Sequence, residues 1–491
     1  MALMEHIAER PSVDVAVEAA RQRAIPIVVQ LAAALSAANV PYCQWQGRLK
    51  SARWAAGVGD VDLLVDRTAA GAFAAVLEAL GFKLALAPPH SHSPGVLSYL
   101  GNDPWLGRLI HVRAHFRLII GTAPHARFRL PIEGAVLESA VQRRCFRTPT
   151  PELELALFVL SSTLRHRERD ALRRAIPQWL RTATRELPLL EEEADPAEAI
   201  GALSRILPDI DALCFDRCLT ALRHDASAGQ RLGARYALER RLRAYAVRTM
   251  PARLVDVASY VAGRTDTAKR LGSGGLVIAL CGADGSGMTT CARALHAWLS
   301  PELSTRLAHL GEPPSSLTTR ALEGLLALCR WWDRKRRRSH PGVATMHTEL
   351  LGHLCLARDR FRVHRKMRQA ASAGAIAICE RYPLAANSAL LGPSSAQGIA
   401  MSLDTRLART LRRREETYYA RIAPPDLTLV LRVDPETAVD RKPMEPAAVV
   451  RARASLLWNA DWSGPGTIVI DGVQPVSDVT AELRLRVWST L

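Results

Sequence analysis

The sequence predicts an α/β protein whose C-terminal domain is a doubly wound parallel sheet. Short apolar stretches of β-prone residues alternate there with helical patterns, and they occupy 276–280, 375–379, 427–433 and 467–470. Strands that are separated by helices in this way are typical of a parallel sheet covered on both faces. A glycine-rich loop joins the first predicted strand to a helical pattern, which is a second sign of this architecture.

Composition divides the chain into three segments, two of which precede this sheet. Residues 1–148 mix strand and helix patterns, which predicts an α+β domain. Residues 149–271 are rich in Leu, Ala and Arg, and they predict a helical connector. The cluster Gly272-Ser273-Gly274-Gly275 then opens the C-terminal domain, 272–491, because glycine and serine favour linkers.

Charge and cysteine usage limit the class of protein. The 491 residues carry a formal net charge of +17, which favours anionic partners such as nucleotides, nucleic acid or acidic lipid. Nine cysteines are scattered along the chain without a CxxC pair, as expected for reduced thiols in a cytoplasmic protein. This pattern argues against a secreted protein that is held together by disulfides.

The N-terminal region shows neither a secretion signal nor a membrane span. Residues Met1 to Val15 mix charged residues without the apolar core of a signal peptide. The stretch from Ala24 to Gly47 lacks charge, but prolines and polar residues interrupt it. Val28, Leu31 and Leu35 fall on one helical face. We therefore expect a buried helix here and no transmembrane segment.

The loop after the first predicted strand of the C-terminal domain has the pattern of a phosphate-binding loop. Glycines allow backbone conformations that point consecutive N–H groups at an anion, and a helix N-terminus favours negative charge. The Thr289 hydroxyl stands where such loops hold Mg²⁺, whereas Met288 replaces their lysine. ATP and Mg²⁺ are the expected ligands, and the residues expected to bind them are Gly282, Asp284, Gly285, Ser286, Gly287, Met288, Thr289 and Thr290.

Further motifs follow in order along the C-terminal domain. They are Glu380-Arg381-Tyr382-Pro383, Pro424-Pro425-Asp426, Asp434-Pro435-Glu436, Arg441-Lys442 and Asp471-Gly472. Together with the loop, these motifs resemble the thymidylate kinase family of nucleoside monophosphate kinases. The resemblance covers about residues 276–491, and it rests on the ordered set because each motif alone is weak.

The resemblance implies transfer of the γ-phosphoryl group of ATP to a nucleoside monophosphate, with thymidylate as the family-level acceptor. It places Asp284 by the acceptor sugar, and Glu380 with Arg381 by the acceptor phosphate. Arg441 and Lys442 would begin a lid, whose arginines would stabilise the transferred charge, namely Arg441, Arg451 and Arg453. A lid cation is also one way to replace the lysine missing at Met288. Glu380 stands in place of the family's more usual aspartate.

The N-terminal domain contains a pair of carboxylates, Asp60 and Asp62, at positions i and i+2 of a predicted strand. Both therefore point to one side, and together they suit a divalent cation. With Gly47 upstream, this segment resembles the nucleotidyltransferase superfamily, including domains of that kind found fused to thymidylate kinase-like domains. The resemblance implies that the glycine turn binds a triphosphate and that the acid pair binds its metal. The strand pattern at 109–118 lacks a third acid and instead carries His111, Arg113 and His115.

Three functions remain open on the sequence. The first is an ATP-binding phosphotransferase whose activity Met288 impairs. The second is a non-catalytic nucleotide-binding regulatory or scaffold protein, which Met288, Arg48 and Arg113 favour. The third is binding of an anionic surface, lipid or nucleic acid, through the basic and aromatic segment Arg330 to Arg338. The sequence leaves the oligomeric state open, with a homodimer among the alternatives.

Overall fold

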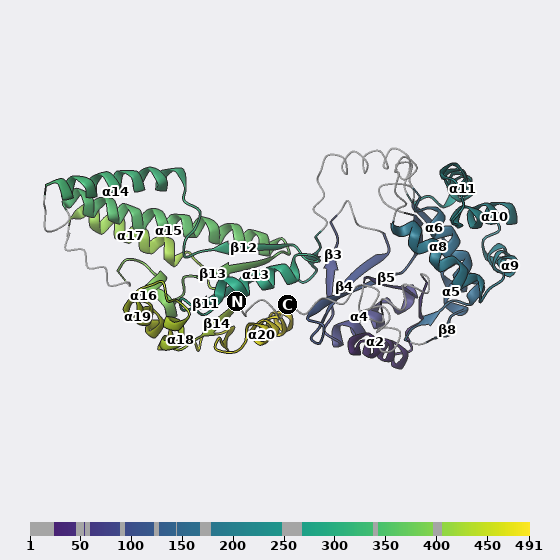
Figure 1. Cartoon of the computed structure of the whole chain (residues 1–491), viewed down its shortest axis with the longest axis horizontal. Coiled ribbons are helices and arrows are strands. Elements are labelled where there is room, and N and C mark those ends of the chain that lie inside the picture. The colour runs from purple at the N-terminus through teal and green to yellow at the C-terminus, as the bar shows by residue number, and fades with distance from the viewer. Residues whose placement is uncertain are drawn as a thin grey trace, which may run out of the picture. The chain divides into compact units, whose positions relative to one another are not determined.

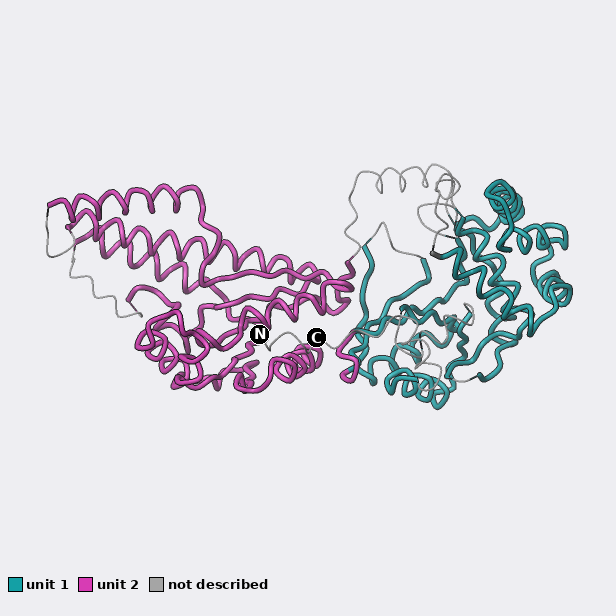
Figure 2. Tube along the Cα trace, viewed as in Figure 1, with its two compact units in different colours: residues 1–103, 109–267 teal, residues 104–108, 268–491 magenta. Residues whose placement is uncertain are grey.

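The computed structural model describes residues 24–45, 54, 59–88, 94–121, 127–143, 145–166, 178–247, 268–336, 342–395 and 405–491. The chain divides into two compact units (Figure 2). Unit 1 comprises Met1–Asp103 with Leu109–Thr267, and unit 2 comprises Pro104–Arg108 with Ala268–Leu491. The three segments expected from composition stay a prediction. The predicted residues Gly47, Arg48, Arg337 and Arg338 lie outside the described residues, as does the segment Met1 to Val15.

The sheet of unit 1 brings the predicted acid pair beside the strand of basic residues. Its strands are β1 (Tyr42–Gln44), β2 (Val61–Val65), β3 (Lys83–Leu86), β4 (Val96–Asp103) and β5 (Arg108–His115), and they neighbour one another in the order β1-β2-β5-β4-β3. β2 and β5 run parallel, whereas β1 and β3 pair antiparallel with β2 and β4. Helices α2 (Pro26–Ala37) and α4 (Ala70–Ala79) pack against each other. The predicted buried helix is confirmed as α2, because Val28, Leu31 and Leu35 lie in the core.

The second part of unit 1 is mainly helical. Its central helix α6 (Pro151–Thr163) is buried over almost its whole length, and its middle, from Leu155 to Leu160, is entirely apolar. Around it pack α8 (Gln178–Glu191), α9 (Pro196–Ile206), α10 (Ala212–Leu222) and α11 (Ala228–Arg241). One hydrophobic core joins these helices to β6 (Leu118–Gly121) and β7 (Arg127–Leu130). The remaining elements are η1 (Arg67–Ala69), α5 (Glu133–Glu138), β8 (Val141–Gln142), β9 (Arg147–Thr148) and η2 (Leu242–Tyr245).

Unit 2 is built on a five-stranded parallel sheet. The strands are β11 (Val277–Gly282), β12 (Thr305–His309), β13 (Ile376–Glu380), β14 (Leu427–Arg432) and β15 (Thr467–Asp471). They neighbour one another in the order β12-β13-β11-β14-β15. Four of them match the predicted strands, and the α/β prediction is confirmed at that level. β12 was not predicted, because it is a partly exposed edge strand without an apolar run.

Helices cover both faces of this sheet (Figure 1). Alternate residues of β11 point to opposite faces. Val277, Ala279 and Cys281 share a core with Ala371 of α15 (Val343–Ser372), whereas Ile278 and Leu280 on the other face are also fully buried. Helices α13 (Met288–Leu299) and α20 (Val476–Thr490) pack against each other and the strands. Both faces are therefore apolar, as a doubly wound sheet requires.

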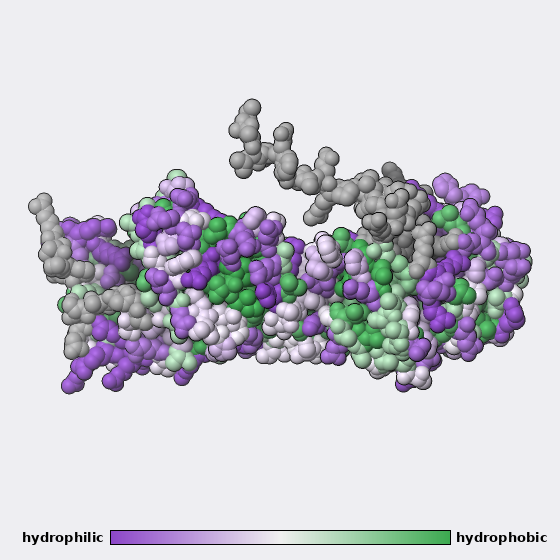
Figure 3. Space-filling model, turned by 90° about the horizontal axis from the view of Figure 1, so that it is seen from below, coloured by the Kyte–Doolittle hydropathy of each residue, from purple (hydrophilic) through white to green (hydrophobic). Residues whose placement is uncertain are grey.

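The remaining elements of unit 2 lie at the ends and edges of the sheet. α14 (Leu317–Lys335) and α17 (Arg406–Ala420) pack against α15. Short elements complete the unit, namely β10 (Arg270–Leu271), η3 (Ala385–Asn387), α16 (Ser388–Leu391), α18 (Pro435–Asp440) and α19 (Ala447–Trp458). Among the described residues, no helix has both the length and the apolar character needed to cross a membrane. The face drawn in Figure 3 carries hydrophobic patches between stretches of hydrophilic residues.

Candidate functional site

The loop between β11 and α13 requires glycine at the predicted positions. Gly285 and Gly287 both adopt φ = 85°, in the left-handed region that side chains disfavour. A Cβ on Gly285 would lie 2.9 Å from the carbonyl oxygen of Ala438. A Cβ on Gly282 would lie 2.5 Å from Ser286 Oγ. The backbone path of this loop therefore depends on the absence of side chains.

This path leaves a group of hydrogen-bond donors without protein acceptors. Helix α13 begins at Met288, and its first backbone bond runs from Cys291 N–H to the Gly287 carbonyl. Among the described residues, Ser286 Oγ is buried and has no hydrogen-bond partner. Several backbone N–H groups likewise donate to no protein oxygen among the described residues: those of Asp284, Gly285, Gly287, Met288, Thr289 and Thr290. Such a cluster of donors at a helix N-terminus fits the oxygens of a phosphate.

Met288 contributes no charge to this loop. Its side chain is 6% exposed, although it opens the first turn of α13. The thioether is a weak hydrogen-bond acceptor and carries no positive charge. The donors of the loop are therefore backbone N–H groups and hydroxyls, without the ammonium group that the motif normally supplies.

Two oxygen-bearing side chains meet beside the loop. Thr289 Oγ1 donates a hydrogen bond of 2.7 Å to Glu380 Oε2. Glu380 ends β13 and pairs in register with Leu280 of the neighbouring β11, which brings it to the carboxyl edge of the sheet. Its side chain is buried. A hydroxyl and a carboxylate at this edge are oxygen ligands of the kind that Mg²⁺ prefers, so the donor set fits the predicted ion.

Asp284 of the loop contacts two arginines. It accepts hydrogen bonds from Arg381, which follows β13, and from Arg453 of α19, the latter at 3.3 Å. Burial acts to raise the pKa of Asp284, but the two guanidinium groups outweigh it and hold that pKa below its usual range. Arg381 has φ = 52°, which is unusual for a residue with a side chain. The backbone strain at Arg381 therefore lies beside the predicted site, where such strain often occurs.

Among the described residues, the other two predicted catalytic arginines have partners other than Asp284. Arg441 donates to the backbone carbonyls of Gly472 at 2.8 Å and Gly285 at 3.4 Å, which ties the loop to the segment after β15. Arg451 forms a two-pronged ion pair with Glu436, with both contacts at 2.8 Å. The structure thus brings Arg381 and Arg453 together on Asp284, whereas Arg441 contacts a backbone carbonyl of the loop and Arg451 pairs with Glu436.

One residue at this edge belongs to none of the predicted motifs. Arg360 of α15 is buried, and it donates to the carbonyls of Leu310 and Gly311 at 2.9 Å each. These residues follow β12, and a Cβ on Gly311 would lie 2.7 Å from the Arg381 side chain. Arg360 therefore holds the segment that packs against Arg381. Its role was missed because β12 itself was not predicted.

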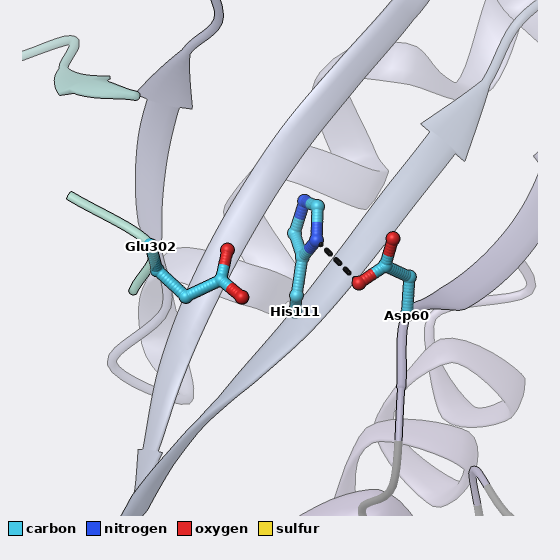
Figure 4. A group of neighbouring side chains, drawn as sticks. All are labelled: Asp60, His111 and Glu302. Atoms are coloured by element: carbon cyan, nitrogen blue, oxygen red, sulfur yellow. Dashed lines mark hydrogen bonds and ion pairs between the residues drawn. The ribbon is translucent and has the colours of Figure 1, made fainter. Parts of the chain in front are cut away.

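The acid pair of unit 1 is enclosed by basic side chains. The parallel register of β2 and β5 sets Asp62 opposite Arg113. Asp62 accepts from Arg113 Nε at 2.6 Å and from Arg113 Nη2 at 2.8 Å, and it lies 2.9 Å from His115 Nε2. Asp60 lies 2.9 Å from His111 Nδ1 (Figure 4). Both carboxylates therefore have partners on β5.

These contacts determine the charge of the acid pair. Burial acts to raise the pKa of Asp62, but the Arg113 charge and the His115 hydrogen bond hold that pKa far below its usual range. The pKa of Asp60 is lowered as well, against burial, by His111 and Arg113. As these side chains lie, the pair does not fit a divalent cation, because the guanidinium of Arg113 already bridges both acids. Metal binding at Asp60 and Asp62 stays a prediction that requires Arg113 to move.

Comparison with known proteins gives a distant similarity. The chain is 24% identical over 223 residues to the "Uncharacterized ATP-binding protein YghR" of Escherichia coli strain K12, which corresponds to 43% of this chain and 86% of that protein. The protein of the same name from Escherichia coli O6:H1 strain CFT073 matches to the same extent. No protein-family model matches the chain.

Proposed function

We propose that unit 2 binds ATP through the loop from Gly282 to Thr290, with Mg²⁺ at Thr289 and Glu380. The observation that carries this proposal is the buried Ser286 hydroxyl within a cluster of backbone N–H groups, none of which has a protein partner among the described residues. A triphosphate would supply acceptors for these donors. The printed name of the Escherichia coli relatives, an ATP-binding protein, adds support.

We further propose that the bound ATP gives its γ-phosphoryl group to a nucleoside monophosphate, as the resemblance to thymidylate kinases implies. In support, Asp284, Glu380 and Arg381 lie together at the carboxyl edge of the sheet, where ligands of such sheets bind. Arg381 would orient an acceptor phosphate, and the loop N–H groups would hold the donor phosphates. Bound Mg²⁺ would supply positive charge to the phosphate oxygens.

The rate of this transfer depends on which group replaces the missing lysine. Arg453 is 51% exposed and shares Asp284 with Arg381, so it is the lid arginine best placed to turn toward the phosphates. Arg441 is less suited, because its guanidinium already donates to backbone carbonyls on both sides. Loss of one preorganised charge stabiliser typically slows catalysis by about two to three powers of ten. We therefore propose a slow phosphotransferase.

A second candidate function is nucleotide binding without turnover, in a regulatory or scaffold protein. Two observations favour it, namely the uncharged Met288 in the loop and the Arg113 bridge across Asp60 and Asp62. On this alternative, both the kinase-like and the nucleotidyltransferase-like sites keep their folds without the charges that catalysis uses. Unit 1 would then contribute no metal-dependent transfer.

These functions are separated by the rate of phosphoryl transfer from Mg-ATP to thymidylate. It is measured in the natural chain, in Met288→Lys and in Met288→Leu. Leucine is the matched control, because it keeps an apolar side chain of similar volume. A slow phosphotransferase predicts measurable turnover in the natural chain, a similar rate with leucine and a rate raised about a hundredfold or more with lysine. ATP binding with no turnover in any variant would favour the regulatory alternative. No ATP binding would contradict both.

A further inference from the structure

The helix α14 presents an apolar face that nothing in the described chain covers. None of its residues is buried, and α15 is the element against which it packs extensively. One side of the helix faces α15 and lines a cavity of about 210 Å³ through Thr319, Leu322 and Leu326. A second apolar stripe lies on the outer side. Its large members are between 46% and 84% exposed: Leu317, Leu325, Leu328, Trp331 and Trp332.

Basic side chains surround the end of this stripe. Lys335 Nζ lies 5.0 Å from the ring centre of Trp331, and the Arg336 guanidinium lies 5.3 Å from that of Trp332. Within the described residues, Arg334, Lys335 and Arg336 pair with no carboxylate. Asp333 faces the other way, since it accepts from Gly342 N–H and Thr345 Oγ1. The outer side of the helix end is therefore cationic as well as apolar.

We infer that this α14 surface, which comprises Leu317, Leu325, Leu328, Trp331, Trp332, Arg334, Lys335 and Arg336, binds membranes that contain acidic phospholipids. An amphipathic helix with leucine and tryptophan on one side can lie in the membrane interface with that side buried. Tryptophan prefers this interface, and neighbouring Lys and Arg contact anionic headgroups. The inference does not depend on the proposed phosphotransferase.

Other binding partners would match only part of this surface, either its cations or its leucines. A nucleic acid would contact the cations and stack on the tryptophans, but it would leave Leu317, Leu325 and Leu328 in water. A second copy of the chain would cover the leucines, but it would bring together two molecules that each carry a net charge of +17. An acidic membrane offers apolar depth and negative charge at the same boundary, so it satisfies both.

Flotation of the full chain with vesicles tests the inference. The vesicles contain phosphatidylcholine alone or phosphatidylcholine mixed with phosphatidylserine. We expect binding to the acidic vesicles only, weakened by added salt because headgroup attraction is screened. The double variant Lys335→Glu and Arg336→Glu should weaken this binding by about tenfold or more. The matched control is Arg240→Glu with Arg243→Glu, which changes the net charge equally at exposed positions of unit 1 and should change binding far less.

A second variant tests the apolar part of the surface. Trp331→Ser with Trp332→Ser should lower the affinity for acidic vesicles by about tenfold and remove a vesicle-induced blue shift of tryptophan fluorescence. Unchanged ATP binding and circular dichroism in both double variants show that unit 2 remains folded. These variants leave the phosphate loop untouched, so loss of ATP binding and loss of vesicle binding are separate readouts.

Several results would overturn the inference. One is no flotation with acidic vesicles, and another is equal flotation with vesicles of phosphatidylcholine alone. Light scattering that shows a dimer converted to a monomer by the tryptophan variant, without vesicle binding by the natural chain, would assign the surface to a second copy. Binding of a DNA or RNA oligonucleotide that the Lys335 and Arg336 variant abolishes, again without vesicle binding, would assign it to nucleic acid.

Discussion

The phosphate loop of unit 2 and the acid pair of unit 1 differ in whether their polar groups already have hydrogen-bond partners in the protein. The loop holds donors without acceptors, because Ser286 Oγ and several backbone N–H groups have no described partner. The acid pair holds acceptors that already have donors, because Arg113, His111 and His115 contact Asp60 and Asp62. Buried polar groups normally find partners, so the loop is suited to an external ligand and the acid pair is not.

The comparison shows why a motif alone does not define a site. Both segments carry a residue pattern that resembles a nucleotide enzyme, and both adjoin a strand of a sheet. The difference comes from the neighbouring strand. Beside the loop, β13 contributes Glu380, and Arg381 follows it; neither side chain occupies the loop donors. Beside the acid pair, β5 contributes Arg113 in the register that closes it.

The largest expected effect is on the acid pair. Asp62→Asn removes the buried carboxylate charge that Arg113 and the buried His115 contact, whereas Arg113 keeps its contact with Asp60. It should lower the free energy of unfolding by about 3 kcal/mol, the low end of the range for a broken buried ion pair. Urea unfolding of the full chain measures this. Asp216→Asn is the control, because Asp216 is an exposed residue of unit 1. Equal effects of the two variants would show that the contacts of Asp62 with Arg113 and His115 do not stabilise the fold.

Acid should remove the same stabilisation. The pKa of Asp62 is lowered in the folded chain, so the unfolded chain takes up the proton first as pH falls. The stability that Asp62 contributes is therefore present above the unfolded pKa, about 3.9, and is lost as the pH falls below it. The difference in unfolding free energy between the natural chain and Asp62→Asn should shrink below about pH 4. A difference that grows on acidification would contradict a lowered pKa of Asp62 in the folded chain.

A smaller effect is expected at the loop. Gly285→Ala places a Cβ 2.9 Å from the Ala438 carbonyl oxygen at a left-handed position, which adds strain of about 1–3 kcal/mol. The loop donors should shift, and affinity for Mg-ATP should fall by about tenfold or more. Calorimetry measures this affinity. Gly201→Ala is the control, since a Cβ there meets nothing within 4 Å. Unchanged affinity in Gly285→Ala would place the nucleotide elsewhere.

The smallest effect is expected for Arg451. It pairs with Glu436, and the two side chains are 47% and 68% exposed, so Arg451→Ala should change stability by less than about 1 kcal/mol. ATP affinity should stay the same, because among the described residues the two side chains bond to each other and not to the loop. Parallel unfolding and calorimetric measurements check both expectations. A large drop in phosphoryl transfer with Arg451→Ala would show that α19 closes over the loop during catalysis.

The sequence predicted the apolar central strands and the segments that hold the candidate site residues. The central strands are fully buried, so their apolar runs are visible, and the loop glycines are fixed by local backbone geometry. The edge strand β12 escaped prediction, since an exposed strand needs no apolar run. The pairing of Arg453 with Asp284, and the position of Arg360, depend on tertiary packing between distant segments. Spacing along the chain carries no signal of such contacts.

The most direct test of the open loop and the closed acid pair is a calorimetric count of Mg-ATP sites in the natural chain, Gly285→Ala and Asp60→Asn. The account predicts one ATP for each chain, an affinity that falls at least about tenfold in Gly285→Ala, and no change in Asp60→Asn. Divalent-dependent ATP binding that is lost in Asp60→Asn and kept in Gly285→Ala would contradict it, because the acid pair would then be the nucleotide site.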